Sequence, residues 1–138
     1  MRADIARRGL SGCVVFRGPV PHHDLPAIYS SVRLTLIPSL CGEGTSLSAL
    51  ESMACGAATI CTAVAGLKDL PGPHAPPEAA ALARVMGEIY LHRLATADEQ
   101  RRLVQAEYSL TRWRRSWRAA LGMVGVPLAA RKQPTLPL

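Results

Sequence analysis

RLTLIPSLCGEGTSLSALESMACGAATICTAV, residues 33–64, contains two short apolar runs on either side of one helical pattern. Residues 33–38 and 58–64 are apolar and partly β-branched, which is typical of buried strands. Between them, apolar residues recur at helical spacing from 45 to 54, and Gly56 follows as the expected helix end. A strand, a helix and a strand joined by short links predict a parallel βαβ unit.

The flanking sequence extends this pattern in both directions. Upstream, Asp24 stands in a capping position just before Pro26, which predicts the start of a short helix. Right-handed crossovers between parallel strands place helices on both faces of the sheet. We therefore expect an α/β fold: a partial Rossmann-like parallel sheet with helices on both faces and a helical C-terminal segment. The further expected elements are a helix ending at Gly9, a buried strand at 13–17 (CVVFR), a helix at 22–32, a stiff proline-rich loop at 71–77, and helices at 78–93, at 96–107 with Thr96 as cap, and at 111–122.

Length and composition limit the class of protein. The 138 residues suit one domain, and a content of 49% hydrophobic and 19% charged residues excludes a disordered chain. The net charge is +6 and nearly all basic residues are arginine, which favours phosphate-bearing partners. With two Trp, three Tyr and one Phe, the chain lacks the aromatic residues of a base-stacking surface, so we expect no nucleic-acid partner. Nucleotide phosphates and an anionic membrane surface both fit the charge.

Neither the cysteines nor the paired histidines form a metal motif. Cys13, Cys41, Cys55 and Cys61 include no CxxC pair, so we expect buried small residues in a reducing cytoplasm. His22 and His23 precede a helix, and we expect them to lie in an exposed loop without an acidic or thiol partner. No metal site is expected.

The loop and helix start at 41–56 carry the candidate ligand chemistry. In an open parallel sheet, ligands bind where the carboxyl ends of strands lead into helix N-termini. A helix N-terminus attracts phosphate, and Gly44 with Thr45 and Ser46 leaves room for it there. The carboxylates of Glu43 and Glu51 accept hydrogen bonds only, so sugar hydroxyls are suitable partners for them.

The same residues have a purely structural interpretation. Ser48 and Glu51 have the spacing of a capping box, in which Glu51 would only satisfy backbone N–H groups at the helix start. Gly42 and Gly44 would then be ordinary turn residues. The local chemistry leaves both interpretations open.

Several segments together resemble a known family. VVFRGPV (14–20), LPAIYSSVRLTLIPS (25–39) and GEGTSLSALESMACGAATICTAVAGLKDL (42–70) resemble the C-terminal domain of the family 4 retaining glycosyltransferases, which have the GT-B architecture of two facing Rossmann-like domains. The family's two glutamates, separated by seven residues, match Glu43 and Glu51. The resemblance covers about residues 5–120.

The resemblance implies a role for each matching residue. Glu43 would be the catalytic residue that contacts the donor sugar, and Glu51 would hold the nucleotide ribose. Arg17 and Gly18 would lie near the base. The reaction would be transfer of a sugar from a nucleotide-diphosphate sugar with retention, without a cofactor or metal, in polysaccharide or glycolipid biosynthesis. The backbone that would receive the diphosphate belongs to Gly44, Thr45, Ser46 and Leu47.

The chain also departs from the family pattern. The N-terminal acceptor-binding domain and the basic arginine–lysine pair that neutralises the diphosphate have no counterpart, so Met1 resembles an internal methionine. Ala65-Gly66 replaces a frequent pair of glycines. We expect a partial domain over 1–123, a flexible tail over 124–138, and poor transfer by the chain alone. A separate N-terminal domain would then be its partner. The alternatives are a non-catalytic nucleotide-sugar-binding or partner module and an inactive gene fragment.

A basic aromatic segment lies near the C-terminus. TRWRRSWR, residues 111–118, places Trp113 and Trp117 one helical turn apart among four arginines. The tryptophans would pack on the sheet or on the absent N-terminal domain. The alternative is a contact with an anionic membrane surface. The cysteines favour a cytoplasmic protein. A membrane contact through Trp113 and Trp117 would place it at the inner face of the membrane.

Overall fold

Three parallel strands in the order β1-β2-β3 form the centre of the molecule. The computed structural model of the chain describes residues 1–42 and 44–124. β1 (Leu34–Ile37) pairs with β2 (Ala58–Thr62) along its whole length, and β2 pairs with the short β3 (His74–Ala75). All five residues of β2 are buried, as expected of a parallel strand that is covered on both faces.

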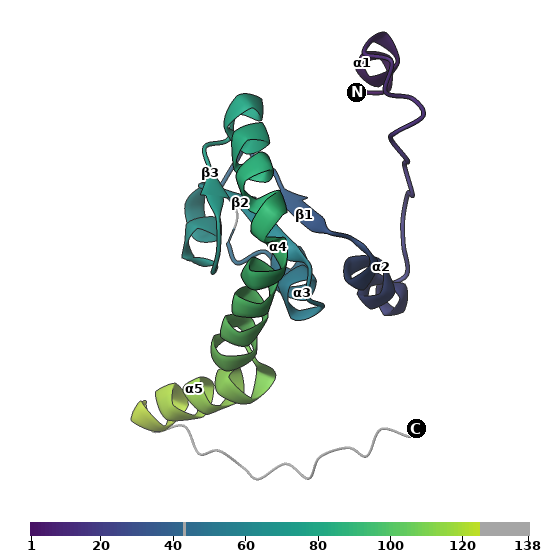
Figure 1. Ribbon diagram of the computed structural model, residues 1–138. Helices are drawn as coiled ribbons and strands as arrows, with labels where there is room; N and C mark the ends of the chain where they lie inside the picture. Colours follow the sequence, from purple (N-terminus) through teal and green to yellow (C-terminus); the bar gives the residue numbers. More distant parts are fainter. Residues whose placement is uncertain (43, 125–138) are drawn as a thin grey trace.

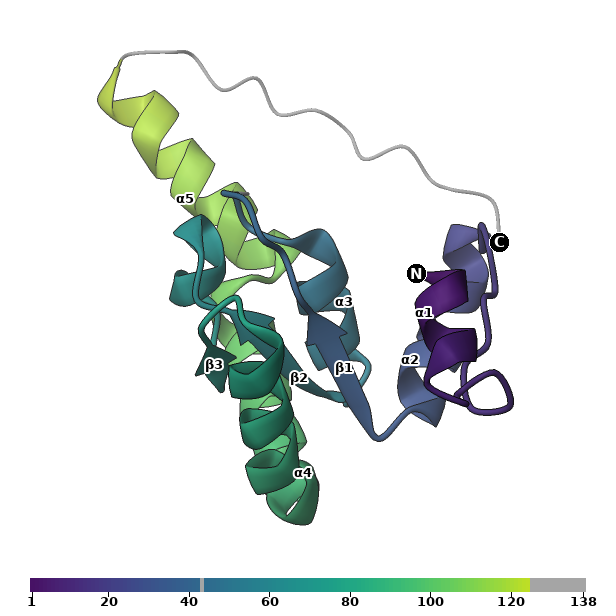
Figure 2. The same cartoon turned by 90° about the horizontal axis from the view of Figure 1, so that it is seen from above.

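The two faces of the sheet are covered by different helices (Figures 1 and 2). α3 (Leu47–Ala54) packs on the face that contains Cys61. The first half of α4 (Ala79–Glu107) packs on the other face, where Val85 meets Ile60. Adjacent strand residues point to opposite faces, so Ile60 and Cys61 belong to separate apolar cores. The expected α/β fold, with a parallel sheet and helices on both faces, is confirmed.

The remaining elements follow the expected order. Gly9 stands just after α1 with a φ of 69°, a left-handed conformation that suits glycine at a helix end. Asp24 is the N-cap residue of α2, although its side chain makes no capping hydrogen bond. These elements are α1 (Arg2–Arg7), η1 (His22–Asp24), α2 (Leu25–Ser31), η2 (Ala65–Asp69) and α5 (Leu110–Met123).

α4 is interrupted by a kink close to the point where the sequence predicts a boundary between two helices. Thr96, the expected cap, lies inside α4, and its hydroxyl donates to the carbonyl oxygen of His92 at 3.3 Å, a bond available to threonine within a helix. His92 has non-helical dihedral angles, φ −110° and ψ 16°, which kink the helix there. The expected division into two helices is therefore confirmed as a kink at His92, whereas the expected role of Thr96 as the cap of the second helix is wrong. The second half of α4 brings Val104 into the core beneath α3.

Residues 13–17 do not form the strand that their composition predicts. Val15 is 81% exposed, and the segment lies apart from the sheet in both views (Figures 1 and 2). Phe16 instead lies under the guanidinium group of Arg2, 4.1 Å from the ring centroid. Strand hydrogen bonds run between strands, so β propensity produces no strand where no neighbour is at hand.

Two smaller expectations also change. Cys61 is buried and Cys55 is half-buried, but Cys13 and Cys41 are exposed, so the expectation of four buried cysteines is wrong. The proline-rich segment at 71–77 contains β3, because pairing of His74 and Ala75 with the end of β2 orders part of the loop. We expected a flexible tail over 124–138. Of this tail, residues 125–138 lie outside the described residues.

Candidate functional site

The N-terminus of α3 opens at the carboxyl end of β1. Ser46 is the N-cap residue, and its carbonyl oxygen accepts the backbone N–H of Leu50 at 3.2 Å, the first bond of the helix. The Ser46 side chain makes no capping hydrogen bond, so no side chain of the cap satisfies the first N–H groups of the helix. Gly44 and Thr45 before it are exposed. The first turn of α3 thus presents backbone donors and a partial positive charge to solvent.

The turn after β2 holds the loop that leads into α3. A methyl group on Gly66 would lie 2.9 Å from the backbone carbonyl carbon and oxygen of Gly44, so only glycine permits this approach. Ala65 beside it has a φ of 36°, a conformation that favours glycine. A Cβ added to Gly42 would lie 3.4 Å from the Cβ of Ala65, so this turn also borders the loop at Gly42. Glu43, the residue between the two loop glycines, lies outside the described residues, and its predicted catalytic role stays a prediction.

Glu51 has a partner that its sequence position does not indicate. His22 Nε2 lies 3.1 Å from Glu51 Oε1, with side-chain exposures of 83% and 34%. Oε2 of Glu51 has no protein partner among the described residues. The expectation that the two histidines have no acidic partner is therefore wrong, because His23 Nε2 also lies 3.4 Å from Asp24 Oδ1. No motif could reveal this contact, because 29 residues separate the two and only the packing of α2 on α3 joins them.

The capping-box interpretation does not describe this helix. Ser48 lies inside α3 rather than at its start, and the N-cap is Ser46. Glu51 makes its contact with His22, on another element. A capping box requires the N-cap hydroxyl and the acidic residue three positions later to bond reciprocally, and neither bond is formed. The carboxylate of Glu51 is thus not used to complete the backbone of α3.

Arg17 and Gly18 lie in the segment between α1 and η1. Both are exposed, and Gly18 has a φ of 68°, which suits a turn. Arg17 has no hydrogen-bond or ion-pair partner among the described residues. Their predicted place near a nucleotide base stays a prediction.

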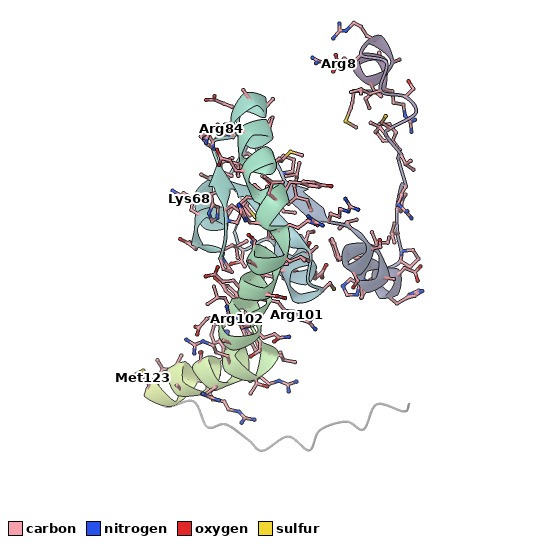
Figure 3. The ribbon with its side chains drawn as sticks, viewed as in Figure 1. Arg8, Lys68, Arg84, Arg101, Arg102 and Met123 are labelled. Atoms are coloured by element: carbon pink, nitrogen blue, oxygen red, sulfur yellow. The ribbon has the colours of Figure 1, made fainter. Side chains whose placement is uncertain are left out.

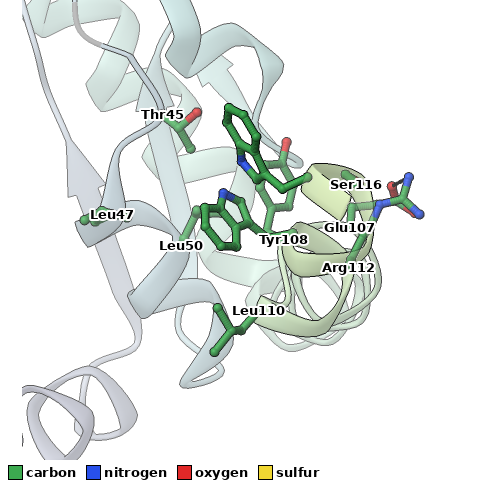
Figure 4. A pocket seen from close by; sticks show the side chains of 10 residues that line it. Thr45, Leu47, Leu50, Glu107, Tyr108, Leu110, Arg112 and Ser116 are labelled. Atoms are coloured by element: carbon green, nitrogen blue, oxygen red, sulfur yellow. Dashed lines mark ion pairs between the residues drawn. The ribbon is translucent and has the colours of Figure 1, made fainter. Parts of the chain in front are cut away.

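A groove of about 640 Å³ runs between the start of α3 and the helix α5 (Figure 4). Two residues assigned to diphosphate binding, Thr45 and Leu47, lie on one wall. The basic residue among its described lining is Arg112, and an ion pair of 2.7 Å with Glu107 already engages it. The other lining residues are Leu50, Tyr108, Leu110, Trp113, Ser116 and Trp117.

The tryptophans do not pack on the sheet as expected. Trp113 and Trp117 are 57% and 52% exposed, and their ring centroids are 6.1 Å apart with the planes tilted by 55°. α5 contains no buried residue, because it extends past the end of the sheet (Figure 1). The two rings therefore border the groove rather than fill a core.

Two kinds of site were searched for in the described parts of the chain. Residues 1–42 and 44–124 contain no group of three or more His, Cys, Asp or Glu side chains arranged to hold a metal ion. None of the helices in these ranges is both long enough and apolar enough to cross a membrane.

Comparisons with solved structures place the fold. The chain matches a sucrose-phosphate synthase from Thermosynechococcus elongatus with a TM-score of 0.72 and 28% identity, over 90% of this chain and 31% of that one. It matches the Anabaena HepE protein, solved in complex with UDP, with a TM-score of 0.80 and 19% identity, over 88% and 35%. The second likeness shows the fold alone.

Comparisons with curated sequences point the same way. A 2-deoxystreptamine N-acetyl-D-glucosaminyltransferase from Streptomyces fradiae is 32% identical over 112 residues, which cover 77% of this chain and 25% of that protein. An O-antigen chain mannosyltransferase B from Escherichia coli is 35% identical over 68 residues, 49% of this chain and 18% of that protein. The chain thus spans about a quarter or less of the length of these relatives.

A family model for group 1 glycosyl transferases matches residues 1–92. This range includes α1 to α3, the whole sheet and the first half of α4. It contains the exposed start of α3, Glu51 with its partner His22, and the turn at Gly66 that lies against the backbone of Gly44. The chain belongs to the group 1 glycosyltransferase family.

Proposed function

We propose that this chain is the donor-binding half of a glycosyltransferase that takes its sugar from a nucleotide-diphosphate sugar. The observation that carries the proposal is the placement of Glu51: a half-buried carboxylate on α3 with one oxygen free, close behind an uncapped helix N-terminus. The start of α3 and the loop just before it would bind the diphosphate through backbone N–H groups at Gly44, Thr45, Ser46 and Leu47.

One nucleoside diphosphate can meet both features. Leu47 and Glu51 are four residues apart, about 6 Å along the helix axis. The diphosphate would lie at the positive end of α3, and a ribose hydroxyl would donate to the free Oε2 of Glu51. Arg17 and Gly18 would then face the base, and Glu43 the donor sugar. In the transfer, the anomeric carbon exchanges its bond to a diphosphate oxygen for a bond to an acceptor hydroxyl oxygen, with retention of configuration, and the hydroxyl proton passes to the departing diphosphate.

The described lining of the groove offers no free cation for the leaving diphosphate. Among its described lining residues, the basic side chain is Arg112, which is paired with Glu107. Charge that develops on the leaving group is stabilised chiefly by fixed positive groups, and the acceptor must also be held in place. We therefore infer that transfer requires a separate acceptor-binding domain, which supplies positive groups for the diphosphate and holds the acceptor in place. The chain alone should bind nucleoside diphosphate and transfer sugar poorly, and multiple-turnover transfer by the isolated chain would refute this second part.

Titration calorimetry with UDP, GDP and ADP tests the donor site. We expect saturable heat with at least one of them, and at least about tenfold weaker binding in Glu51→Ala, because a hydrogen bond to a charged group contributes about 1.5–3 kcal/mol. Glu88→Ala is the matched control, since it also removes an exposed glutamate paired with a basic residue on a helix. No binding up to millimolar concentrations, or equal losses in both variants, would overturn the proposal.

A further inference from the structure

The contact between His22 and Glu51 makes the two oxygens of the carboxylate unequal. Nε2 of His22 lies 3.1 Å from Oε1, whereas Oε2 has no protein partner among the described residues. An ionised carboxylate only accepts hydrogen bonds, so Nε2 carries a proton and donates it to Oε1. The neutral and the protonated imidazole can both make this bond, because either form can carry a proton on Nε2. Oε1 is therefore engaged before a ligand arrives.

The backbone around His22 holds the imidazole beside Glu51. The carbonyl oxygen of His22 accepts the N–H of Leu25, in the turn that leads from η1 into α2. α2 in turn packs on α3, and Ser30 Oγ donates to the carbonyl oxygen of Cys55 just after α3 at 3.5 Å. The imidazole thus reaches Glu51 from an element that is itself anchored on α3.

Long basic side chains on other elements leave Oε2 open. Lys68 extends from η2, and Arg101 and Arg102 extend from the second half of α4 (Figure 3). None of these three pairs with the carboxylate of Glu51. Within residues 1–42 and 44–124, the polar partner of this carboxylate is His22, so one oxygen remains for a ligand.

The number of open oxygens matters for the sugar of the nucleotide. Ribose has neighbouring 2′ and 3′ hydroxyls, which can donate to the two oxygens of one carboxylate, whereas 2′-deoxyribose offers the 3′ hydroxyl alone. With Oε1 engaged, one hydroxyl finds an open oxygen, and both sugars have a 3′ hydroxyl to give. A 2′ hydroxyl that displaced the imidazole would exchange one hydrogen bond to Oε1 for another, with little net gain.

We propose that His22 makes the donor site accept 2′-deoxyribonucleoside diphosphates nearly as well as ribonucleoside diphosphates. The proposal rests on the proposed function, since it concerns the nucleotide that would bind at α3 and Glu51. His22 is then a specificity-determining residue that acts through Glu51 and not by touching the ligand. The donors of the transfer would include sugars carried by a deoxyribonucleoside diphosphate as well as sugars carried by a ribonucleoside diphosphate.

Titration calorimetry with matched nucleotides tests the proposal. UDP and 2′-deoxy-UDP differ in one hydroxyl and have the same charge, as do the corresponding guanine and adenine pairs. The wild type should bind the two members of a pair with affinities within about threefold of each other. In His22→Ala the ribonucleotide should bind more tightly and the deoxyribonucleotide equally well, so the ratio of affinities should rise at least about threefold. His22→Gln, whose amide N–H can donate to Oε1, should keep the wild-type ratio.

The control and the contrary outcomes separate this proposal from the donor site itself. His23→Ala should leave the ratio unchanged, because His23 lies next to Asp24 and not Glu51. A preference of the wild type for the ribonucleotide of about tenfold or more would overturn the proposal. Equal changes of both affinities in His22→Ala would also overturn it, since a purely structural role affects the two nucleotides alike. In either case, weaker binding by Glu51→Ala would leave the donor site in place, whereas no binding of any pair would refute both.

Discussion

The side-chain amide of Gln100 in α4 lies against the backbone of Thr59 in β2 as a neighbouring strand would. Gln100 Oε1 accepts a hydrogen bond from the Thr59 N–H at 2.9 Å, and Nε2 donates to the Thr59 carbonyl oxygen at 2.7 Å. Nε2 also donates to the carbonyl oxygen of Pro71 at 3.0 Å. β3 begins only at His74, which pairs with Cys61, so the amide continues the ladder toward the start of β2. It anchors α4 to the sheet.

Gln100→Leu should destabilise the protein strongly. Gln100 is 1% exposed, and leucine would leave the N–H and carbonyl of Thr59 buried without partners, at a cost of about 1–3 kcal/mol for each group. We expect the free energy of unfolding, measured by urea denaturation with circular dichroism, to fall by at least about 2 kcal/mol. Gln105→Leu, at an exposed position of the same helix, should change it by less than about 0.5 kcal/mol. Similar values for the two variants would contradict the role of the amide.

Ala65→Gly should stabilise the protein. Ala65 has a φ of 36°, and a residue other than glycine in the left-handed region costs about 1–2 kcal/mol. Glycine loses more conformational freedom on folding, by about 0.5–1 kcal/mol, which offsets part of the gain. A rise of about 0.5–1 kcal/mol in the free energy of unfolding is the expected result of urea denaturation. A fall would show that Ala65 is held without strain.

Gly66→Ala, one residue further, should act in the opposite direction. Its methyl group would lie 2.9 Å from the backbone of Gly44, and backbone atoms cannot yield as a flexible side chain can. The loop before α3 must then move, so stability should fall and UDP should bind more weakly than to the wild type. Unchanged nucleotide affinity would mean that the loop position does not matter for the proposed donor site.

His22→Ala should increase nucleotide affinity by a few-fold. His22 occupies Oε1 of Glu51, and its removal leaves both carboxylate oxygens open to a ribose diol, a gain of about one hydrogen bond. The pair is exposed, so stability should change by no more than about 1 kcal/mol. His23→Ala is the control, because His23 lies next to Asp24 and not Glu51. Weaker binding by His22→Ala alone would indicate that the histidine contacts the ligand or orients the carboxylate.

The central strand–helix–strand unit could be predicted because its signals are local. Apolar runs of strand length, helical spacing over 45–54 and a glycine after the helix each act within a few residues. Gly56 has the positive φ of 84° that a helix end requires. The position of the start of α3 follows from the same local order of strand, loop and helix, but its lack of a side-chain cap does not, because serine at the N-cap usually predicts a capping hydrogen bond.

Local propensity was insufficient where an element depends on a distant neighbour. CVVFR at 13–17 has the composition of a strand but no strand beside it among the described residues, and it stays exposed. The expected boundary between two helices is present as the kink at His92, but Thr96 does not cap the second one, because its hydroxyl donates to the carbonyl oxygen of His92.

By itself, the sequence determined the order of strands and helices around residues 33–64 and the resemblance to a glycosyltransferase domain. Both depend on residues that lie close together in the sequence. Only the tertiary structure decided which side chains meet. It joined His22 to Glu51 across 29 residues and Gln100 to Thr59 across 41, and it left the tryptophans of α5 in the open. The physical reason is that these contacts arise from the packing of separate elements, which no local pattern of residues encodes.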